Sequence, residues 1–219
     1  GAQGYCDVVL YSPNHTLIPS QLPAEHWRKI VDLWTSRTAE LFANDLIQQV
    51  YAFENTGIAI GVTMPHPHGQ IYSFPFIPPL IQRELDGARA HYDANNKENL
   101  YLRLLDEELK DGRRIVASND HFIAFVPFAA RFPAEVQIYA RRHVTALMDL
   151  SSEQKDALAQ LIKIVRMKYD NLFGFAMPLM MVVRQRPAKG DHPYFLFHVE
   201  FLPIQRSATK LKYLAGVET

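Results

Sequence analysis

Two long segments of the chain place apolar residues at helical spacing. The first begins near Pro23, and its stripe comprises Trp27, Ile30, Val31, Trp34, Thr38 and Leu41. The second follows Ser151 and Ser152, two candidates for a helix cap, and its stripe comprises Leu158, Leu161, Ile162, Val165 and Tyr169. Spacing of this kind predicts an amphipathic helix that packs one face on a core. We therefore predict two long helices of the same type.

A third helical region, residues 80–109, lies between these two helices. Asn95 and Asn96 interrupt it and Asp111-Gly112 closes it, because such residues favour turns and helix ends. Short segments rich in β-branched and aromatic residues predict strands. They cover residues 7–11, 48–53, 70–74, 114–117, 122–126, 135–139, 179–183 and 194–201. The pattern predicts an α+β fold in which helices pack on an antiparallel sheet.

The two halves of the chain repeat the same order of features. His15, Leu22 and Glu25 recur at identical spacings as His143, Leu150 and Glu153, and His68 and Gln70 recur as His198 and Glu200. Strand, helix, strand and histidine arriving twice in one order indicate a duplication. We predict two copies of one α+β unit. Residues 1–79 hold part of the first, and residues 80–219 hold a connecting helix and the second.

Charge and composition narrow the classes of function. The 219 residues contain 23 Lys and Arg and 23 Asp and Glu, so no basic excess favours nucleic acid or an anionic membrane surface. The apolar runs are too short to span a bilayer. One cysteine, Cys6, excludes an internal disulfide framework. No signal-peptide pattern precedes it, and we expect a cytoplasmic protein.

The chemical signal is strongest at residues 66–70, His-Pro-His-Gly-Gln. Two histidines at i and i+2 of an extended segment point to the same face, and we expect Gly69 to let a ligand approach the backbone. A neutral imidazole attacks phosphorus without a separate base when its other nitrogen is held by an acceptor. This pattern favours a covalent phosphoramidate on histidine.

The preceding segment adds groups suited to a phosphate. Asn55 and Thr63 supply neutral donors, and Gly57 and Gly61 free the backbone for close approach. Gln70 adds an amide on the strand face that carries His68. Glycines alone would be weak evidence, but glycines together with paired histidines and an amide indicate a site.

Residues 53–57 and 66–70 resemble the active-site signature of the galactose-1-phosphate uridylyltransferase family, within the histidine-triad superfamily. The resemblance extends over nearly the whole chain, through residues 12–15, 111–113, 125–128, 169–173, 206–209 and 212–216. It implies two histidine-triad-like halves. It also implies ping-pong exchange of UMP between UDP-glucose and galactose 1-phosphate through a uridylyl-histidine.

The resemblance assigns roles to individual residues. His68 matches the nucleophile, and Gln70 matches the amide that steadies the nucleotidylated histidine. Asn55, Gly61 and Thr63 match positions that contact the phosphates, although the family often has Ser where Thr63 stands. A third histidine replaces this glutamine in histidine-triad hydrolases, so the amide favours a transferase.

Further positions imply a homodimer and a zinc ion. Lys212, Tyr213 and Glu218 match positions that reach the sugar phosphate across a dimer interface in the family. His15 and His66 match two zinc ligands, while the usual Cys-x-x-Cys pair is not in this chain. Two imidazoles alone leave a tetrahedral zinc site incomplete.

A second metal site of the family, usually for iron, would use Glu84 and His198. The other histidine ligands fall where this chain has Arg184 and Glu200. A guanidinium cannot ligate a cation and repels it. We therefore expect this site to be lost or altered.

Two other functions stay open at the level of the sequence. One is a nucleotide phosphorylase, or a transferase for another nucleotidyl sugar, in the same superfamily. The other is a non-catalytic nucleotide-binding partner, such as one half of a split enzyme.

Overall fold

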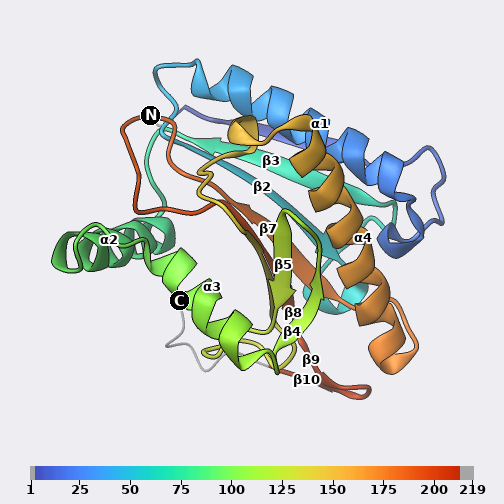
Figure 1. Cartoon of the computed structure of the whole chain (residues 1–219). Helices are drawn as coiled ribbons and strands as arrows, with labels where there is room; N and C mark the ends of the chain where they lie inside the picture. The colour runs from blue at the N-terminus through green and yellow to red at the C-terminus, as the bar shows by residue number, and fades with distance from the viewer. Residues whose placement is uncertain (1–2, 213–219) are drawn as a thin grey trace.

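A computed structural model describes residues 3–212 and places an eight-stranded antiparallel sheet at the centre of that part of the chain (Figure 1). The strands are β1 (Tyr5–Leu10), β2 (Gln49–Thr56), β3 (His68–Phe74), β4 (Ile115–Ser118), β5 (Phe122–Phe125), β6 (Val136–Ala140), β7 (Leu179–Arg184) and β8 (His198–Pro203). Their spatial order is β1-β3-β2-β7-β8-β6-β5-β4. A small hairpin of β9 (Gln205–Ser207) and β10 (Lys210–Leu211) follows.

Four α-helices pack on this sheet within residues 3–212. They are α1 (Ala24–Phe42), α2 (Pro79–Ala94), α3 (Leu100–Asp111) and α4 (Ser152–Phe173). Three short 3-10 turns accompany them: η1 (Pro19–Gln21), η2 (Ile58–Ile60) and η3 (Leu147–Asp149). The predicted mixture of long helices and antiparallel strands is confirmed. None of the helices within the described range is long and apolar enough to cross a membrane.

The two halves repeat one arrangement around the β2–β7 pair. In each half a short 3-10 turn, η1 or η3, leads into a long helix, α1 or α4. A histidine begins strand β3 in the first half and strand β8 in the second, and each strand lies between two neighbours of its own half. The three-strand units β1-β3-β2 and β7-β8-β6 therefore correspond, which is the spatial form of the repeat seen in the sequence.

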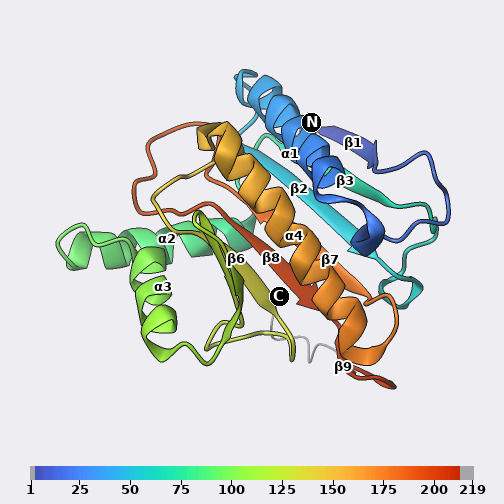
Figure 2. The ribbon, with the colours of Figure 1, turned by 45° about the vertical axis from the view of Figure 1, so that its right-hand side comes forward.

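Helices α1 and α4 lie side by side on one face of the sheet (Figure 2). Trp27 of α1 packs its ring edge-on against Tyr11, with centroids 5.5 Å apart, and Tyr169 of α4 packs on Phe201 of β8 at 6.0 Å. The N-cap Ser151 accepts a hydrogen bond from the Gln154 N–H, so α4 begins where the sequence predicts. Burial of the two apolar stripes holds these helices against the sheet.

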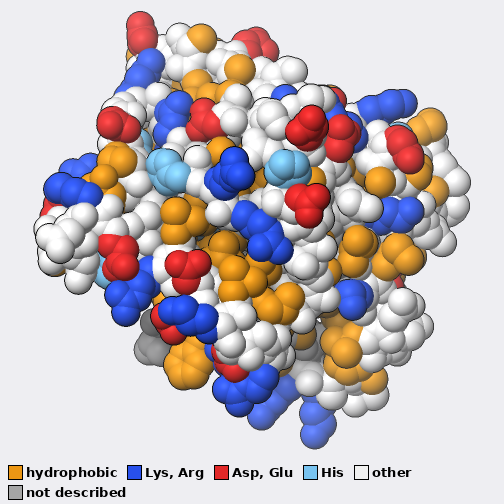
Figure 3. All heavy atoms as spheres, viewed as in Figure 1, with side chains coloured by type: hydrophobic (Ala, Val, Ile, Leu, Met, Phe, Trp, Pro, Cys, Tyr) orange, Lys and Arg blue, Asp and Glu red, His pale blue; other side chains and the backbone are white. Residues whose placement is uncertain are grey.

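The opposite face of the sheet is covered unevenly. Helix α3 packs there on the second half, where the Tyr101 ring lies 5.4 Å from the His198 ring. On the first half, Val8 and Leu10 of β1 leave 56% and 62% of their surface exposed on that face. Acidic and basic side chains are interspersed over much of the molecular face in Figure 3, with apolar atoms exposed near its centre. The two halves thus share a backbone arrangement but differ in what packs on this face of the sheet.

One predicted interruption is confirmed, and one predicted strand differs from the structure. The region predicted at 80–109 forms two helices, interrupted as predicted, because Asn96 and Lys97 adopt positive φ angles between α2 and α3. The strand predicted at 194–201 begins only at His198. Residues before it turn instead, since the Phe195 N–H donates to the His192 carbonyl. This turn leaves the Leu196 carbonyl free to accept a bond from the His198 ring.

Candidate active site

A cavity of about 480 Å³ opens beside the beginning of β3 in the first half. Its lining comes from the turn before α1, the end of β2 with the loop that follows, the His-Pro-His segment and the segment before β7. The lining residues are Leu17, Ile18, Pro19, Glu54, Asn55, Thr56, Gly57, Ile58, Ala59, Val62, Met64, Pro65, His66, Pro67, His68, Ala176 and Pro178. The histidines of the motif therefore line one cavity together with Asn55 and Gly57.

His68 lines this cavity, and a backbone carbonyl holds its ring. Its Nδ1 lies 2.8 Å from the His66 carbonyl oxygen. A carbonyl only accepts, so Nδ1 carries the proton and Nε2 carries the lone pair. The side chain is half-buried and lines the cavity. This is the geometry of a nucleophilic imidazole whose second nitrogen is held by an acceptor.

Pro67 and Gly69 both lie against Tyr11, in the segment that follows β1. The Pro67 carbonyl accepts a 2.9 Å hydrogen bond from the Tyr11 N–H. Gly69 faces the core, where an added Cβ would lie 2.1 Å from the Tyr11 hydroxyl oxygen and 3.1 Å from the Phe53 carbonyl oxygen. The expectation that Gly69 admits a ligand is therefore wrong. Glycine is needed because Tyr11 occupies the space of a side chain.

Gln70 stands two residues beyond His68 on the same strand face, outside the cavity lining. Its cross-strand partners are apolar, Val8 on β1 and Phe53 on β2. Its amide oxygen accepts a 2.9 Å hydrogen bond from the Tyr72 hydroxyl. Gln70 was identified from the sequence but Tyr72 was not. Its position two residues after Gln70, on the same face of the strand, could have indicated the contact.

The loop between β2 and β3 holds the other phosphate candidates. Asn55 ends up in the cavity lining. Gly57 and Gly61 have φ angles of 97° and 87°, and at Gly57 an added Cβ would lie 2.9 Å from Pro178. Gly61 and Thr63 are exposed and do not line the cavity, although their neighbour Val62 does. The structure thus brings Asn55 to His68 and leaves Gly61 and Thr63 on the rim.

A buried ion pair lies beneath the site and was not found from the sequence. Glu54 of β2 pairs with Arg166 of α4 at 2.6 Å, with side chains 1% and 4% exposed. Arg166 also donates to the Thr56 hydroxyl at 3.2 Å. Burial, followed by the charge of Glu54, raises the pKa of the Tyr11 hydroxyl. One feature of the sequence could have revealed this pair. Arg166 is a charged residue that stands four positions after Ile162, within the apolar stripe of α4.

The two zinc candidates face each other. Nδ1 of His15 and Nδ1 of His66 lie 3.1 Å apart. Two nitrogens at tetrahedral angles around zinc lie about 3.3 Å apart, given Zn–N bonds near 2.0–2.1 Å. Residues 3–212 hold no group of three or more His, Cys, Asp or Glu side chains that could bind a metal. Within the described residues, these two histidines therefore lie together without a third such side chain beside them.

In the second half, charged groups surround His198. Its Nδ1 donates to the Leu196 carbonyl at 2.8 Å, and its Nε2 lies 3.5 Å from Glu84. Arg184 pairs with Glu200 at 2.9 Å and lies 3.9 Å from Glu84. Burial opposes ionisation of Glu84, but the His198 hydrogen bond and the Arg184 charge together lower its pKa to about 2.

The C-terminal candidates are only partly described. Lys212 places its ammonium 5.5 Å from the centre of the Phe132 ring and is not among the cavity-lining residues. Its N–H donates to the Ile204 carbonyl at 2.7 Å, and the Ile204 N–H donates to Pro178 of the cavity lining at 3.4 Å. Tyr213 and Glu218 lie outside the described residues.

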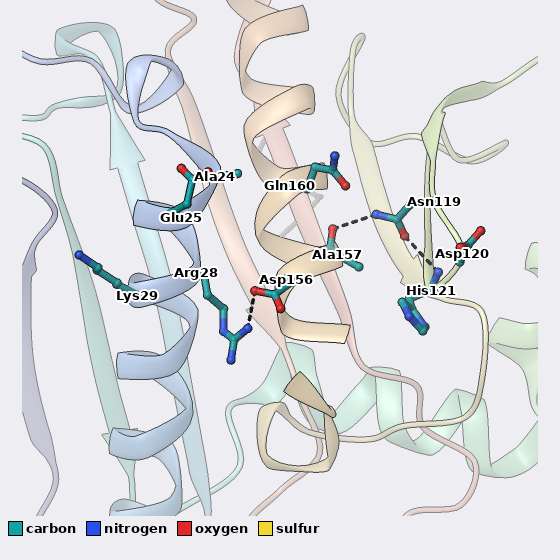
Figure 4. Close-up of a pocket in the computed structure, with 10 residues that line it drawn as sticks. All are labelled: Ala24, Glu25, Arg28, Lys29, Asn119, Asp120, His121, Asp156, Ala157 and Gln160. Atoms are coloured by element: carbon teal, nitrogen blue, oxygen red, sulfur yellow. Dashed lines mark hydrogen bonds and ion pairs between the residues drawn. The ribbon is translucent and has the colours of Figure 1, made fainter. Parts of the chain in front are cut away.

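A larger depression of about 600 Å³ lies between α1, α4 and the turn before β5 (Figure 4). Two of its charged side chains, Arg28 and Asp156, already pair with each other. Arg28 also pairs with Asp32, and the Asn119 amide donates to the Ala157 carbonyl at 2.9 Å. Paired charges on an open surface are weak ligands for a substrate. The smaller cavity at His68 is therefore the better candidate for chemistry.

Comparison with known proteins gives consistent matches. Residues 1–78 match the N-terminal domain of galactose-1-phosphate uridyl transferase, and residues 86–219 match its C-terminal domain. The galactose-1-phosphate uridylyltransferase of Thermotoga maritima is 40% identical and covers 100% of this chain and 68% of its own length. That of Haemophilus influenzae is 35% identical, with shares of 99% and 62%.

A solved structure gives the same match in three dimensions. A uridylyltransferase mutant superposes with a TM-score of 0.93 at 33% identity, over 99% of this chain and 71% of its own. The chain spans between 50% and 68% of the lengths of four curated relatives. The similarity therefore covers the cavity, the histidine motif and the second half together.

Proposed function

Because this chain belongs to the galactose-1-phosphate uridylyltransferase family, we propose that it transfers a uridylyl group between UDP-glucose and galactose 1-phosphate through His68. One observation carries the proposal. His68 lines a cavity while its Nδ1 is engaged with a backbone carbonyl, which leaves Nε2 as the ring nitrogen available for attack. An imidazole held in this way is a nucleophile of the right kind for phosphorus.

In the first half-reaction, Nε2 of His68 attacks the uridylyl phosphorus of UDP-glucose. The new N–P bond forms as the P–O bond to the sugar phosphate breaks, and glucose 1-phosphate leaves with the electron pair. The imidazole becomes cationic, and the His66 carbonyl stabilises it through the Nδ1–H bond. No proton needs to leave the nucleophile during attack, so no separate base is required.

In the second half-reaction, an ionised phosphate oxygen of galactose 1-phosphate attacks the same phosphorus. The N–P bond breaks, UDP-galactose forms, and the neutral imidazole of His68 returns. Asn55 supplies an amide donor in the cavity lining for the phosphoryl oxygens. Gln70 supplies a second amide, and because an amide does not act as a general base near neutral pH, it does not help water to attack.

We also propose that His15 and His66 hold zinc through their Nδ1 atoms. The 3.1 Å separation of those atoms suits two corners of a tetrahedral site. When bound, zinc would supply a fixed link between the loop before η1 and the histidine motif, with no part in the chemical step. The His66 carbonyl also accepts the hydrogen bond from Nδ1 of His68. The position of His66 therefore affects the orientation of the proposed nucleophile.

For the second family site, we propose that Arg184 takes the place of a cation. Its guanidinium pairs with Glu200 and approaches Glu84, and Arg131 pairs with Glu200 at 2.7 Å. Two guanidinium groups supply the positive charge that a metal would otherwise bring. The residues present do not fit an iron ion, and no step of the reaction uses this cluster.

We further propose a homodimer in the cytoplasm. The support for the dimer is that Lys212, Tyr213 and Glu218 match family positions that reach the sugar phosphate across an interface. Lys212 does not line the cavity of its own chain, which is consistent with such a role. The single exposed cysteine suits a reducing compartment.

The proposal is tested by incubating the protein with UDP-glucose labelled in the uridine part. We expect label to attach to protein with the acid lability and base stability of a phosphoramidate. Addition of galactose 1-phosphate should discharge it into UDP-galactose. Failure to label, or loss of label to water as fast as to the sugar phosphate, would contradict the proposal.

A further inference from the structure

The amide of Gln70 has few polar neighbours on its face of the sheet. Directly across from it lie Val8 and Phe53, neither of which offers a side-chain donor or acceptor. Along its own strand, His68 and Tyr72 stand on the same face at i−2 and i+2. The amide is therefore oriented by groups on β3 and not by the neighbouring strands.

Tyr72 makes the contact that distinguishes the two ends of this amide. Its hydroxyl donates to Oε1 of Gln70 at 2.9 Å. With the oxygen engaged by Tyr72, the NH2 group is the end of the amide left to donate to another acceptor. A flipped amide would point its oxygen toward the anionic phosphoryl group that His68 receives, and two oxygen acceptors repel.

Tyr72 is itself held in place as a donor. Its ring packs edge-on against Phe53 with centroids 4.9 Å apart and against Phe74 at 6.2 Å. Its cross-strand partner on β1 is Cys6. Burial, as the largest cause, raises the pKa of the Tyr72 hydroxyl, so the hydroxyl keeps the proton that it donates to Gln70.

We propose that Tyr72 is a positioning residue that fixes the amide of Gln70 with its NH2 toward the uridylyl group on His68. The inference rests on the function proposed above and extends it by one residue. Tyr72 touches neither the substrate nor His68. It acts by selecting one of two amide orientations before substrate binds.

The test is a double-mutant cycle on the rate of uridylylation, followed by intact-mass spectrometry in single turnovers. A net hydrogen bond of ordinary strength corresponds to about a 3- to 10-fold bias between orientations. We expect Tyr72→Phe to slow uridylylation by about that factor, with the apparent affinity for UDP-glucose unchanged. In the Gln70→Ala background, the same substitution should have no further effect, because the group it positions is gone.

Tyr51→Phe is the matched control. Tyr51 is the cross-strand partner of Tyr72 on β2 and loses the same hydroxyl, but it lies across from Tyr72 and not beside Gln70 along β3. We expect Tyr51→Phe to be uridylylated at the same rate as the unaltered protein. Equal slowing by both substitutions, or additive effects of Tyr72→Phe and Gln70→Ala, would overturn the inference while leaving the proposed function intact.

A second readout does not depend on activity. The side-chain carbonyl carbon of Gln70, observed by NMR in labelled protein, should change its chemical shift in Tyr72→Phe and keep it in Tyr51→Phe. An unchanged resonance in Tyr72→Phe would overturn the inference even if the unaltered protein formed no adduct. Absence of any adduct together with a shifted Gln70 resonance would contradict the proposed function and retain the contact.

Discussion

His68 and His198 occupy corresponding positions in the two halves, and the comparison separates what the fold repeats from what it does not. Each begins a central strand, β3 or β8, and each donates its Nδ1–H to the carbonyl two residues earlier at 2.8 Å. The fold therefore repeats the same hydrogen bond from Nδ1 to a backbone carbonyl in both halves. This hydrogen bond alone does not make a nucleophile.

The surroundings of the two imidazoles differ. His68 lines an open cavity, whereas His198 is 1% exposed beneath Tyr101 of α3. Nε2 of His198 lies 3.5 Å from the carboxylate of Glu84. Access to the cavity supports the proposed role of His68 as the nucleophile, whereas burial and a carboxylate partner make His198 a structural contact.

Removal of each histidine gives the largest expected contrast. His68→Gly should reduce uridylyl exchange by more than about 10³-fold, because the reaction loses its nucleophile, while the melting temperature changes little. His198→Ala should lower the melting temperature and leave the rate per folded molecule near normal, because it removes a buried ring. Exchange rates and thermal unfolding measured on both variants check this. Near-normal exchange by His68→Gly would break the comparison.

The next largest effect concerns the buried ion pair of Glu54 and Arg166, which joins the two halves. Arg166→Met should destabilise the fold by about 3–5 kcal/mol, because it leaves the carboxylate of Glu54 buried without its charge partner. Lys189→Met is the control, since Lys189 also pairs across the halves, with Asp45, but at the surface. Denaturant unfolding of both variants measures the difference. Equal stability of the two would show that burial of the Glu54 pair contributes nothing.

A smaller effect is expected at the position where the halves carry an amide and a carboxylate. Gln70→His should weaken exchange by about tenfold and raise the fraction of UDP-glucose lost to water, because an imidazole carries protons and an amide does not. The released UMP and UDP-galactose, separated by chromatography, give the two fractions. An unchanged hydrolytic fraction would argue against the amide as the feature that protects the intermediate.

The smallest effect is a pH shift in the second half. Glu84 has a pKa of about 2 in the folded protein, below the usual value near 4.5, so it contributes stability above about pH 4.5 that is lost as the pH falls toward 2. Tyr101→Phe removes a hydrogen bond, from the Tyr101 hydroxyl to the Glu84 carboxylate at 3.2 Å, that helps to lower this pKa. The acid-unfolding midpoint, followed by circular dichroism, should therefore move to higher pH. A midpoint that stays fixed would contradict the role given to the Tyr101 hydroxyl.

The parts of the fold that could be predicted are those fixed by local pattern. The stripes of α1 and α4 and the motif at residues 66–70 are visible because neighbouring positions in sequence share a face. The same locality explains why Gln70 and His68 could be placed together. Their placement needed only the two-residue period of a strand.

The parts that could not be predicted depend on distant contacts. Glu54 and Arg166 come from opposite halves of the chain, and nothing near either one in the sequence shows that they meet. Gly69 is required by the hydroxyl of Tyr11, which reaches it from the segment that follows β1. The cover of His198 by α3 is of the same kind, since a region read as a connector decides which histidine is accessible.

The central claim is that one of two matching histidines is the nucleophile. It is tested most directly by trapping the protein with UDP-glucose, digesting it under alkaline conditions and locating the UMP adduct by peptide mass spectrometry. The account predicts one adduct, on His68, and none on His198. An adduct on His198 or His66, or exchange that proceeds with no adduct on any histidine, would contradict it.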